Sequence, residues 1–124
     1  MIDIKIVFRL NDFAKCKQIL ETVFADLNWD YRTILNQSSS YGGFCTVGKL
    51  SDDSVRVLIN ENSEQNTKAF LKVLYNYHQN VRFVEILYNN ESANIVYQAN
   101  YSISPVNTGE DITGQYVNID YSIF

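Results

Sequence analysis

An α+β domain is the fold class that the sequence predicts, and three observations predict it. Segments with apolar residues at every second position are typical of strands with one buried face. Between them lie segments whose apolar residues recur every three or four positions, as in helices that cover a core. The 124 residues are 46% hydrophobic and 19% charged, which suits one domain over residues 1–124.

The first strand is predicted over residues 2–10, because Ile2, Ile4, Ile6, Phe8 and Leu10 alternate with more polar positions. A helix follows, capped by Asn11 or Asp12 and ending near Asn28. Its apolar stripe consists of Phe13, Cys16, Leu20, Val23, Phe24 and Leu27. The chain is therefore expected to begin with a strand and a helix that share one core.

The middle of the chain repeats the strand pattern twice before a second helix. Residues 36–43 have the composition of a loop. Residues 44–50 and 54–60 are predicted to form a hairpin, joined by Ser51-Asp52-Asp53. The second helix is expected to begin at Asn62 or Ser63 and to end near Asn80. Its buried stripe consists of Phe70, Val73, Leu74 and Tyr77.

The final third of the chain is predicted to be β-structure. Residues 81–88 are apolar on both faces, as expected of a central strand, and Asn89-Asn90 signals a turn. Alternation over residues 93–103 and 117–123 predicts a long terminal hairpin with a wide loop at 105–114. The first six elements have the order β-α-β-β-α-β, which is the ferredoxin-like order, and the terminal hairpin is added to it. This order predicts an antiparallel sheet packed on two helices.

No motif for catalysis, phosphate binding or a metal stands out. Glycine-rich phosphate loops are missing from the sequence, and two cysteines with one histidine lack zinc-site spacing. His78 is expected near a helix C-terminus, where the helix dipole alone favours it. Cys45 lies in an ordinary strand pattern, so a buried thiol is the favoured interpretation. The chain is expected to need no cofactor and no metal and not to be an enzyme.

The sequence also limits the cellular compartments and the classes of partner that we expect. Charged residues interrupt the N-terminal apolar stretch, and no run of about 18 apolar residues exists, so neither a secretory signal nor a membrane span is expected. We therefore expect a cytoplasmic protein with two reduced, buried thiols, Cys16 and Cys45. A nucleic-acid partner is not expected, since the chain is acidic and residues 54–60 carry no aromatic side chain.

Charge is distributed unevenly along the chain. Residues 1–82 hold ten Lys or Arg and nine Asp or Glu, a net charge of +1. Residues 83–124 hold no Lys or Arg, five acidic residues and five tyrosines, a net charge of −5. Tyrosine is enriched at protein interfaces, and carboxylates accelerate association with basic partners. The C-terminal segment therefore predicts an acidic, tyrosine-bearing contact surface.

The favoured function is a non-enzymatic, protein-binding inhibitor. We expect an immunity protein that neutralises a cognate bacterial toxin, such as a nuclease, by binding its basic surface. The partner-binding residues predicted for this role are Glu91, Glu110, Asp111, Tyr116 and Asp120. Their carboxylates would complement a basic cleft, and Tyr116 lies on the more polar face of its strand. The chain is expected to be a monomer or a homodimer.

Two other functions remain open. A small-molecule-binding regulatory module would act as a dimer and would hold its ligand in a pocket lined by the open sheet face. An enzyme would use Cys45 as a nucleophile and His78 as its base, which requires the two side chains to be neighbours in space.

Overall fold

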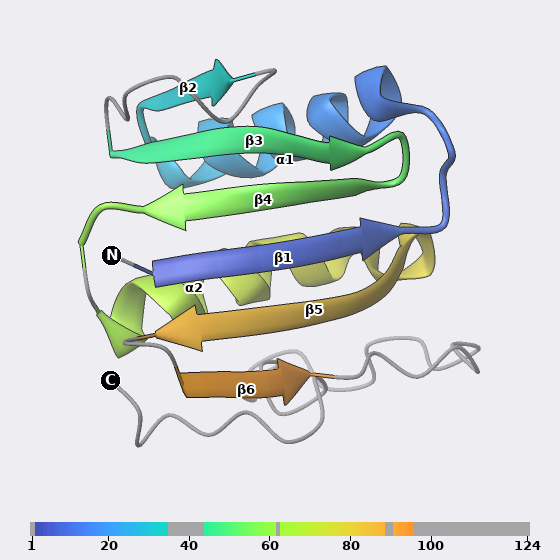
Figure 1. Cartoon of the computed structure of the whole chain (residues 1–124). Helices are drawn as coiled ribbons and strands as arrows, with labels where there is room; N and C mark the ends of the chain where they lie inside the picture. The colour runs from blue at the N-terminus through green and yellow to red at the C-terminus, as the bar shows by residue number, and fades with distance from the viewer. Residues whose placement is uncertain (1, 35–43, 62, 89–90, 96–124) are drawn as a thin grey trace.

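The structure is a computed structural model that describes residues 2–34, 44–61, 63–88 and 91–95. Within these ranges the chain forms a largely antiparallel β-sheet and two α-helices, which confirms the predicted α+β class (Figure 1). The elements in chain order are β1 (Ile2–Phe8), α1 (Phe13–Leu27), β2 (Tyr31–Ile34), β3 (Cys45–Ser51), β4 (Ser54–Ile59), α2 (Glu64–Leu74), the 3-10 helix η1 (Tyr75–Asn80), β5 (Val81–Tyr88) and β6 (Glu91–Ile95).

One sheet contains all the described strands, in the order β2-β3-β4-β1-β5-β6. Within the run β3-β4-β1-β5 every pair of adjacent strands is antiparallel, as predicted, and β6 continues the antiparallel pattern beyond β5. Strand β1 lies between β4 and β5, so Ile4 pairs with Val57 on one side and with Ile86 on the other. The two halves of the chain therefore meet at β1.

Strand β2 was not predicted, and it departs from the antiparallel pattern. It has four residues and pairs in parallel with β3, with Tyr31 opposite Cys45. A segment this short has too few positions to show alternation, and its partner lies beyond the intervening residues 35–43. The predicted antiparallel sheet is therefore extended at one edge by a parallel strand.

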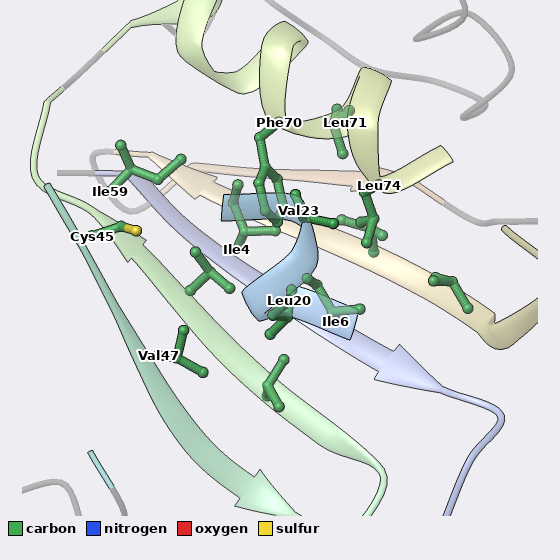
Figure 2. Close-up of a cluster of buried hydrophobic side chains, with 14 of the residues drawn as sticks. Ile4, Ile6, Leu20, Val23, Cys45, Val47, Ile59, Phe70, Leu71 and Leu74 are labelled. Carbon is green, nitrogen blue, oxygen red and sulfur yellow. The ribbon is translucent and has the colours of Figure 1, made fainter. Parts of the chain in front are cut away.

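Both helices pack on the same face of the sheet (Figure 1). The hydrophobic core contains residues of both helices and of that sheet face. Figure 2 shows side chains of α1 and α2 meeting those of β1, β3 and β4. The fully buried residues include most of the predicted stripes: Ile2, Ile4, Ile6, Phe8, Cys16, Leu20, Val23, Phe24, Phe70 and Leu74. The apolar periodicity thus located the core face of each of these elements.

Local capping explains where the helices begin and where α1 ends. The Asp12 carboxylate accepts hydrogen bonds from the backbone N–H groups of Ala14 and Lys15, and Ser63 Oγ accepts one from Asn66 N. Helix α1 ends at Asn28, which has the left-handed conformation with φ 56° and ψ 38°. The predicted caps at Asp12 and Ser63 and the predicted end at Asn28 are therefore confirmed.

The end of the second helix differs from the prediction. The α-helix stops at Leu74, and residues 75–80 form η1 instead. Within η1, Tyr77 has φ −112° and ψ 22°, which breaks the regular helix, and its side chain is only half-buried. Apolar spacing alone could not distinguish a final α-helical turn from a 3-10 turn, because both bury residues three apart.

The C-terminal hairpin is described only at its beginning. Strand β6 begins at Glu91, two residues before the predicted start, and turns back to pair with β5. Residues 96–103, the loop at 105–114 and the strand at 117–123 lie outside the described residues. In the part of the chain that is described, neither helix has the length and apolar character needed to cross a bilayer.

Candidate functional site

The sheet face opposite the helices carries a cluster of charged residues around a hollow. Alternate positions of β1, β4 and β5 point to this outer face, because their neighbours Ile4, Val57 and Ile86 point to the core. The hollow has a volume of about 270 Å³. Its walls are formed by Asp3, Lys5, Leu50, Arg56, Glu85 and Leu87.

One half of the charged cluster is an ion pair between neighbouring strands. Arg56 Nε lies 3.0 Å from both carboxylate oxygens of Asp3, and Arg56 Nη2 lies 2.5 Å from Oδ2. The Asp3 side chain is 17% exposed and that of Arg56 is 39% exposed, so solvent screens the attraction considerably. The pair fixes both side chains more by its two-pronged geometry than by its energy.

The other half consists of two opposite charges, Lys5 and Glu85, that form no ion pair with each other. Lys5 and Glu85 lie directly opposite each other in the β1–β5 pairing. Among the described residues, however, no ion pair includes either of them. The Lys5 ammonium instead lies 6.0 Å from the centroid of the Phe83 ring, at the outer limit of a cation–π contact. Both charges are available to a ligand.

The predicted partner-binding residues can be compared with this surface only in part. Glu91 begins β6, and its backbone pairs with Tyr88. Its side chain, like all of Glu110, Asp111, Tyr116 and Asp120, lies outside the described residues. Glu85 belongs to the same acidic segment, and the structure places it on the outer face, one strand away from β6.

The sequence analysis did not single out the residues of the hollow. Asp3, Lys5 and Arg56 occupy polar positions in alternating segments, which was the available signal, whereas Glu85 lies in a segment that is otherwise mostly apolar. Grouping them requires the strand order β3-β4-β1-β5, because it brings residues 3, 56 and 85 onto adjacent strands. Alternation predicts which face a residue occupies but does not predict which strands are neighbours.

Cys45, the candidate nucleophile, is a fully buried thiol. Burial, and secondarily the charge of Asp30, raises the pKa of Cys45 to about 12. Its Sγ donates a hydrogen bond to the Asp30 carbonyl oxygen at 3.5 Å. Since the thiolate is the reactive form of cysteine, the raised pKa favours the protonated, less nucleophilic form of Cys45 at neutral pH.

His78, the candidate base, is buried in η1. Its Nδ1 lies 3.0 Å from the Tyr75 carbonyl oxygen, and its ring stacks on that of Tyr75 at a centroid distance of 4.8 Å. The ring is thus held by its own turn of the chain. Cys45 begins β3 and His78 lies in η1, and the hydrogen bonds described above join each of them to a backbone carbonyl of another residue. Within the described residues, no group of three side chains is suited to a metal.

The acidic turn between β3 and β4 has internal partners. Lys49 Nζ lies 3.1 Å from the Asp52 carboxylate, and Ser51 Oγ donates to Asp53 Oδ1 at 2.6 Å. These contacts engage the two carboxylates that could have held a hard cation. The turn is explained by hairpin geometry alone.

Comparison with known proteins gives no relative. No protein-family model, no curated protein and no solved structure matches this chain. Any function must therefore be argued from the chain itself.

Proposed function

We propose that this protein is a non-enzymatic inhibitor that binds another protein, acting in the cytoplasm as an immunity protein against a bacterial toxin with a basic surface. The observation that carries the proposal is the charge distribution, because residues 83–124 hold five carboxylates and no basic residue. Such a segment accelerates association with a basic partner and favours that partner over acidic ones. Catalysis is not needed for this role, since binding alone blocks the toxin.

The described part of the acidic segment supports a contact role at the β5–β6 edge. Strand β6 is the last strand at that edge of the described sheet, with its backbone paired to β5 on one side only. Glu85, on β5, has no ion-pair partner among the described residues. We propose that the partner contacts Glu91, Glu110, Asp111, Tyr116 and Asp120.

We also infer that the core, β1-α1-β3-β4-α2-β5, has the ferredoxin-like order. The sheet order β3-β4-β1-β5 supports this inference, because each helix then connects two parallel strands that are separated by one antiparallel strand. Both helices cover the same face, which leaves the opposite face and the β6 edge as the surfaces where function can differ between proteins of this architecture (Figure 1).

The first test is capture of the partner. The tagged protein is used to pull down proteins from its native host, with washes at low and high salt, and the bound proteins are identified by mass spectrometry. We expect one basic protein that is retained at low salt and released at high salt, because ionic strength screens exposed charges. The captured protein should carry a toxic activity that the inhibitor abolishes at equimolar concentration. Failure to capture a basic protein would contradict the proposal.

The second test locates the contact on the acidic segment. The double variant Glu110→Lys/Asp111→Lys should weaken binding of the captured partner at least about tenfold, with little change in melting temperature. The matched control is Asp26→Lys/Glu61→Lys, which changes the net charge equally at two exposed positions outside the segment. Calorimetric titration measures both affinities. Equal weakening by the two variants would show that net charge, rather than this segment, drives binding.

A further inference from the structure

We propose that the hollow on the outer sheet face binds a small zwitterion, an α-amino acid with an apolar side chain. Glu85 would accept hydrogen bonds from the ligand ammonium, and Lys5 would donate to the ligand carboxylate. Leu50 and Leu87 would contact the apolar side chain. This site does not depend on the protein-binding role proposed above, and either can fail without the other, although Glu85 belongs to the acidic segment considered for that role.

The charges of the hollow select this class of ligand. Its walls carry two cationic residues, Lys5 and Arg56, and two anionic residues, Asp3 and Glu85. A purely basic ligand would meet repulsion from the first pair, and a purely acidic ligand would meet repulsion from the second. The hollow has no net charge, so it favours a ligand that carries both signs close together.

The two halves of the charged cluster have different roles: one pair holds the wall of the hollow, and the other pair binds the ligand. Asp3 and Arg56 engage each other through two oxygens and two nitrogens, which holds the side of the hollow formed by β1 and β4. Lys5 and Glu85 are opposite in register but are not ion-paired, so each has capacity for a ligand group. Their adjacent backbone positions place a cation and an anion within reach of one small molecule.

The size of the hollow favours a small ligand. Pockets for drug-sized ligands usually enclose about 300–1,000 Å³, and this hollow of about 270 Å³ lies just below that range. A second copy of the chain would make an isologous contact, in which the same surface patch faces itself. Such a contact centred here would set two hollows face to face and leave a void, which packing disfavours.

The apolar wall determines the side chain of the ligand. Leu50 is 38% exposed, a large value for a leucine of a strand, and Leu87 is half-buried two residues from Glu85 on the same strand. An aliphatic side chain would remove both leucines from water. The three recognition elements, ammonium, carboxylate and apolar group, are therefore all represented on one face of the sheet.

NMR titration of the full chain with L-leucine tests the proposal. Exposed ion pairs contribute little, so we expect a dissociation constant of about 1 mM and shifts confined to the backbone signals of β1, β4 and β5 around the hollow. Glu85→Gln and Lys5→Gln should each weaken binding roughly tenfold. The matched controls Lys17→Gln and Glu21→Gln remove an exposed ion pair on α1 and should leave binding unchanged.

Two leucine analogues test separately which protein charge binds which ligand group. Because each variant should affect only one analogue, a general loss of folding cannot produce the expected pattern. L-Leucinamide keeps the ammonium, so Glu85→Gln should weaken its binding and Lys5→Gln should not. N-Acetyl-L-leucine keeps the carboxylate and should show the reverse. The absence of shifts at about 20 mM leucine, which would follow if residues 96–124 or a second copy occupied the hollow, would overturn the proposal. Equal responses of both analogues to both variants would overturn it as well.

Discussion

At the scale of single residues, the two cysteines show how burial sets chemistry. Both are free and buried. Desolvation is the largest cause that raises the pKa of each thiol, although the backbone around Asp12 partly opposes it for Cys16. Each sulfur also donates to a backbone carbonyl oxygen, Leu10 for Cys16 and Asp30 for Cys45. These thiols therefore act as small apolar residues that satisfy nearby carbonyl groups.

The raised pKa of Cys45 predicts a loss of stability in alkali. An unfolded cysteine releases its proton near pH 9, whereas the folded thiol keeps its proton up to about pH 12. Between these values the native state binds more protons, so the free energy of unfolding falls as pH rises. The stabilisation is complete below about pH 9 and is lost as pH approaches 12.

Urea unfolding at a series of pH values measures this effect. Cys45→Ala should flatten the decline by up to about 1.4 kcal/mol per pH unit relative to the unsubstituted protein. Val47→Ala is the control, because it removes buried apolar atoms from the same face of β3 without removing a titrating group. A Cys45→Ala profile that runs parallel to that of Val47→Ala would show that this thiol does not titrate as described.

At the scale of elements, a side chain fixes the start of α1 and backbone hydrogen bonds fix its end. Asp12 Oδ1 accepts from Ala14 N at 3.0 Å and from Lys15 N at 3.4 Å. At the other end, Asn28 N donates to Ala25 O at 3.2 Å, and Trp29 N donates to Phe24 O at 3.0 Å. These bonds satisfy backbone groups that a helix leaves without internal partners. They also set the direction in which the chain leaves the helix for β2.

Substitutions at the two caps should therefore lower the free energy of unfolding for different reasons. At Asp12 the side-chain acceptor matters, and at Asn28 the left-handed backbone conformation matters. Asp12→Ala should lower the free energy of unfolding by about 1 kcal/mol, because it removes the acceptor. Asn28→Ala should cost about 1 kcal/mol, whereas Asn28→Gly should be nearly neutral, since glycine adopts positive φ without strain. Chemical denaturation measures all three. Gln18→Ala, at an exposed position in mid-helix, is the control, and equal effects of Asn28→Gly and Asn28→Ala would contradict the left-handed cap.

At the scale of the whole molecule, β1 is the strand that joins the two halves. It pairs with β4 through residues 54–59 and with β5 through residues 81–87. Its core-facing residues Ile2, Ile4 and Ile6 are fully buried beneath the helices. The domain cannot lose β1 without losing both sheet halves, which favours cooperative unfolding.

Hydrogen exchange should show this arrangement directly. Amides of β1 should exchange only through global unfolding, because the strand is hydrogen-bonded on both sides and buried on its core face. Amides of β2 should exchange faster, since β2 is a four-residue strand at an edge of the described sheet. Mass spectrometry with peptide resolution distinguishes the two. Faster exchange in β1 than in β2 would contradict the described sheet order.

The sequence predicted the individual helices and strands better than it predicted which strands are adjacent in the sheet. Alternation in residues 2–10 located the core face of β1, and the α1 stripe was correct because helical spacing is a local property. Strand β2 was missed because its stability depends on pairing with a segment beyond residues 35–43. The hollow was missed for the same reason, since Asp3, Arg56 and Glu85 become neighbours only through the sheet order. The partner-binding residues predicted from charge stay a prediction.

The central position of β1 also bears on how the chain is made. Within this chain β1 is synthesised first, yet both strands that flank it come later, at residues 54–59 and 81–88. Until residue 88 has left the ribosome, the apolar face of Ile2, Ile4 and Ile6 has no complete sheet to join. Nascent segments of this kind are prone to aggregate or to recruit chaperones. Asp3 and Lys5 alternate with those isoleucines. Their charges oppose aggregation of the β1 segment before β4 and β5 have been synthesised.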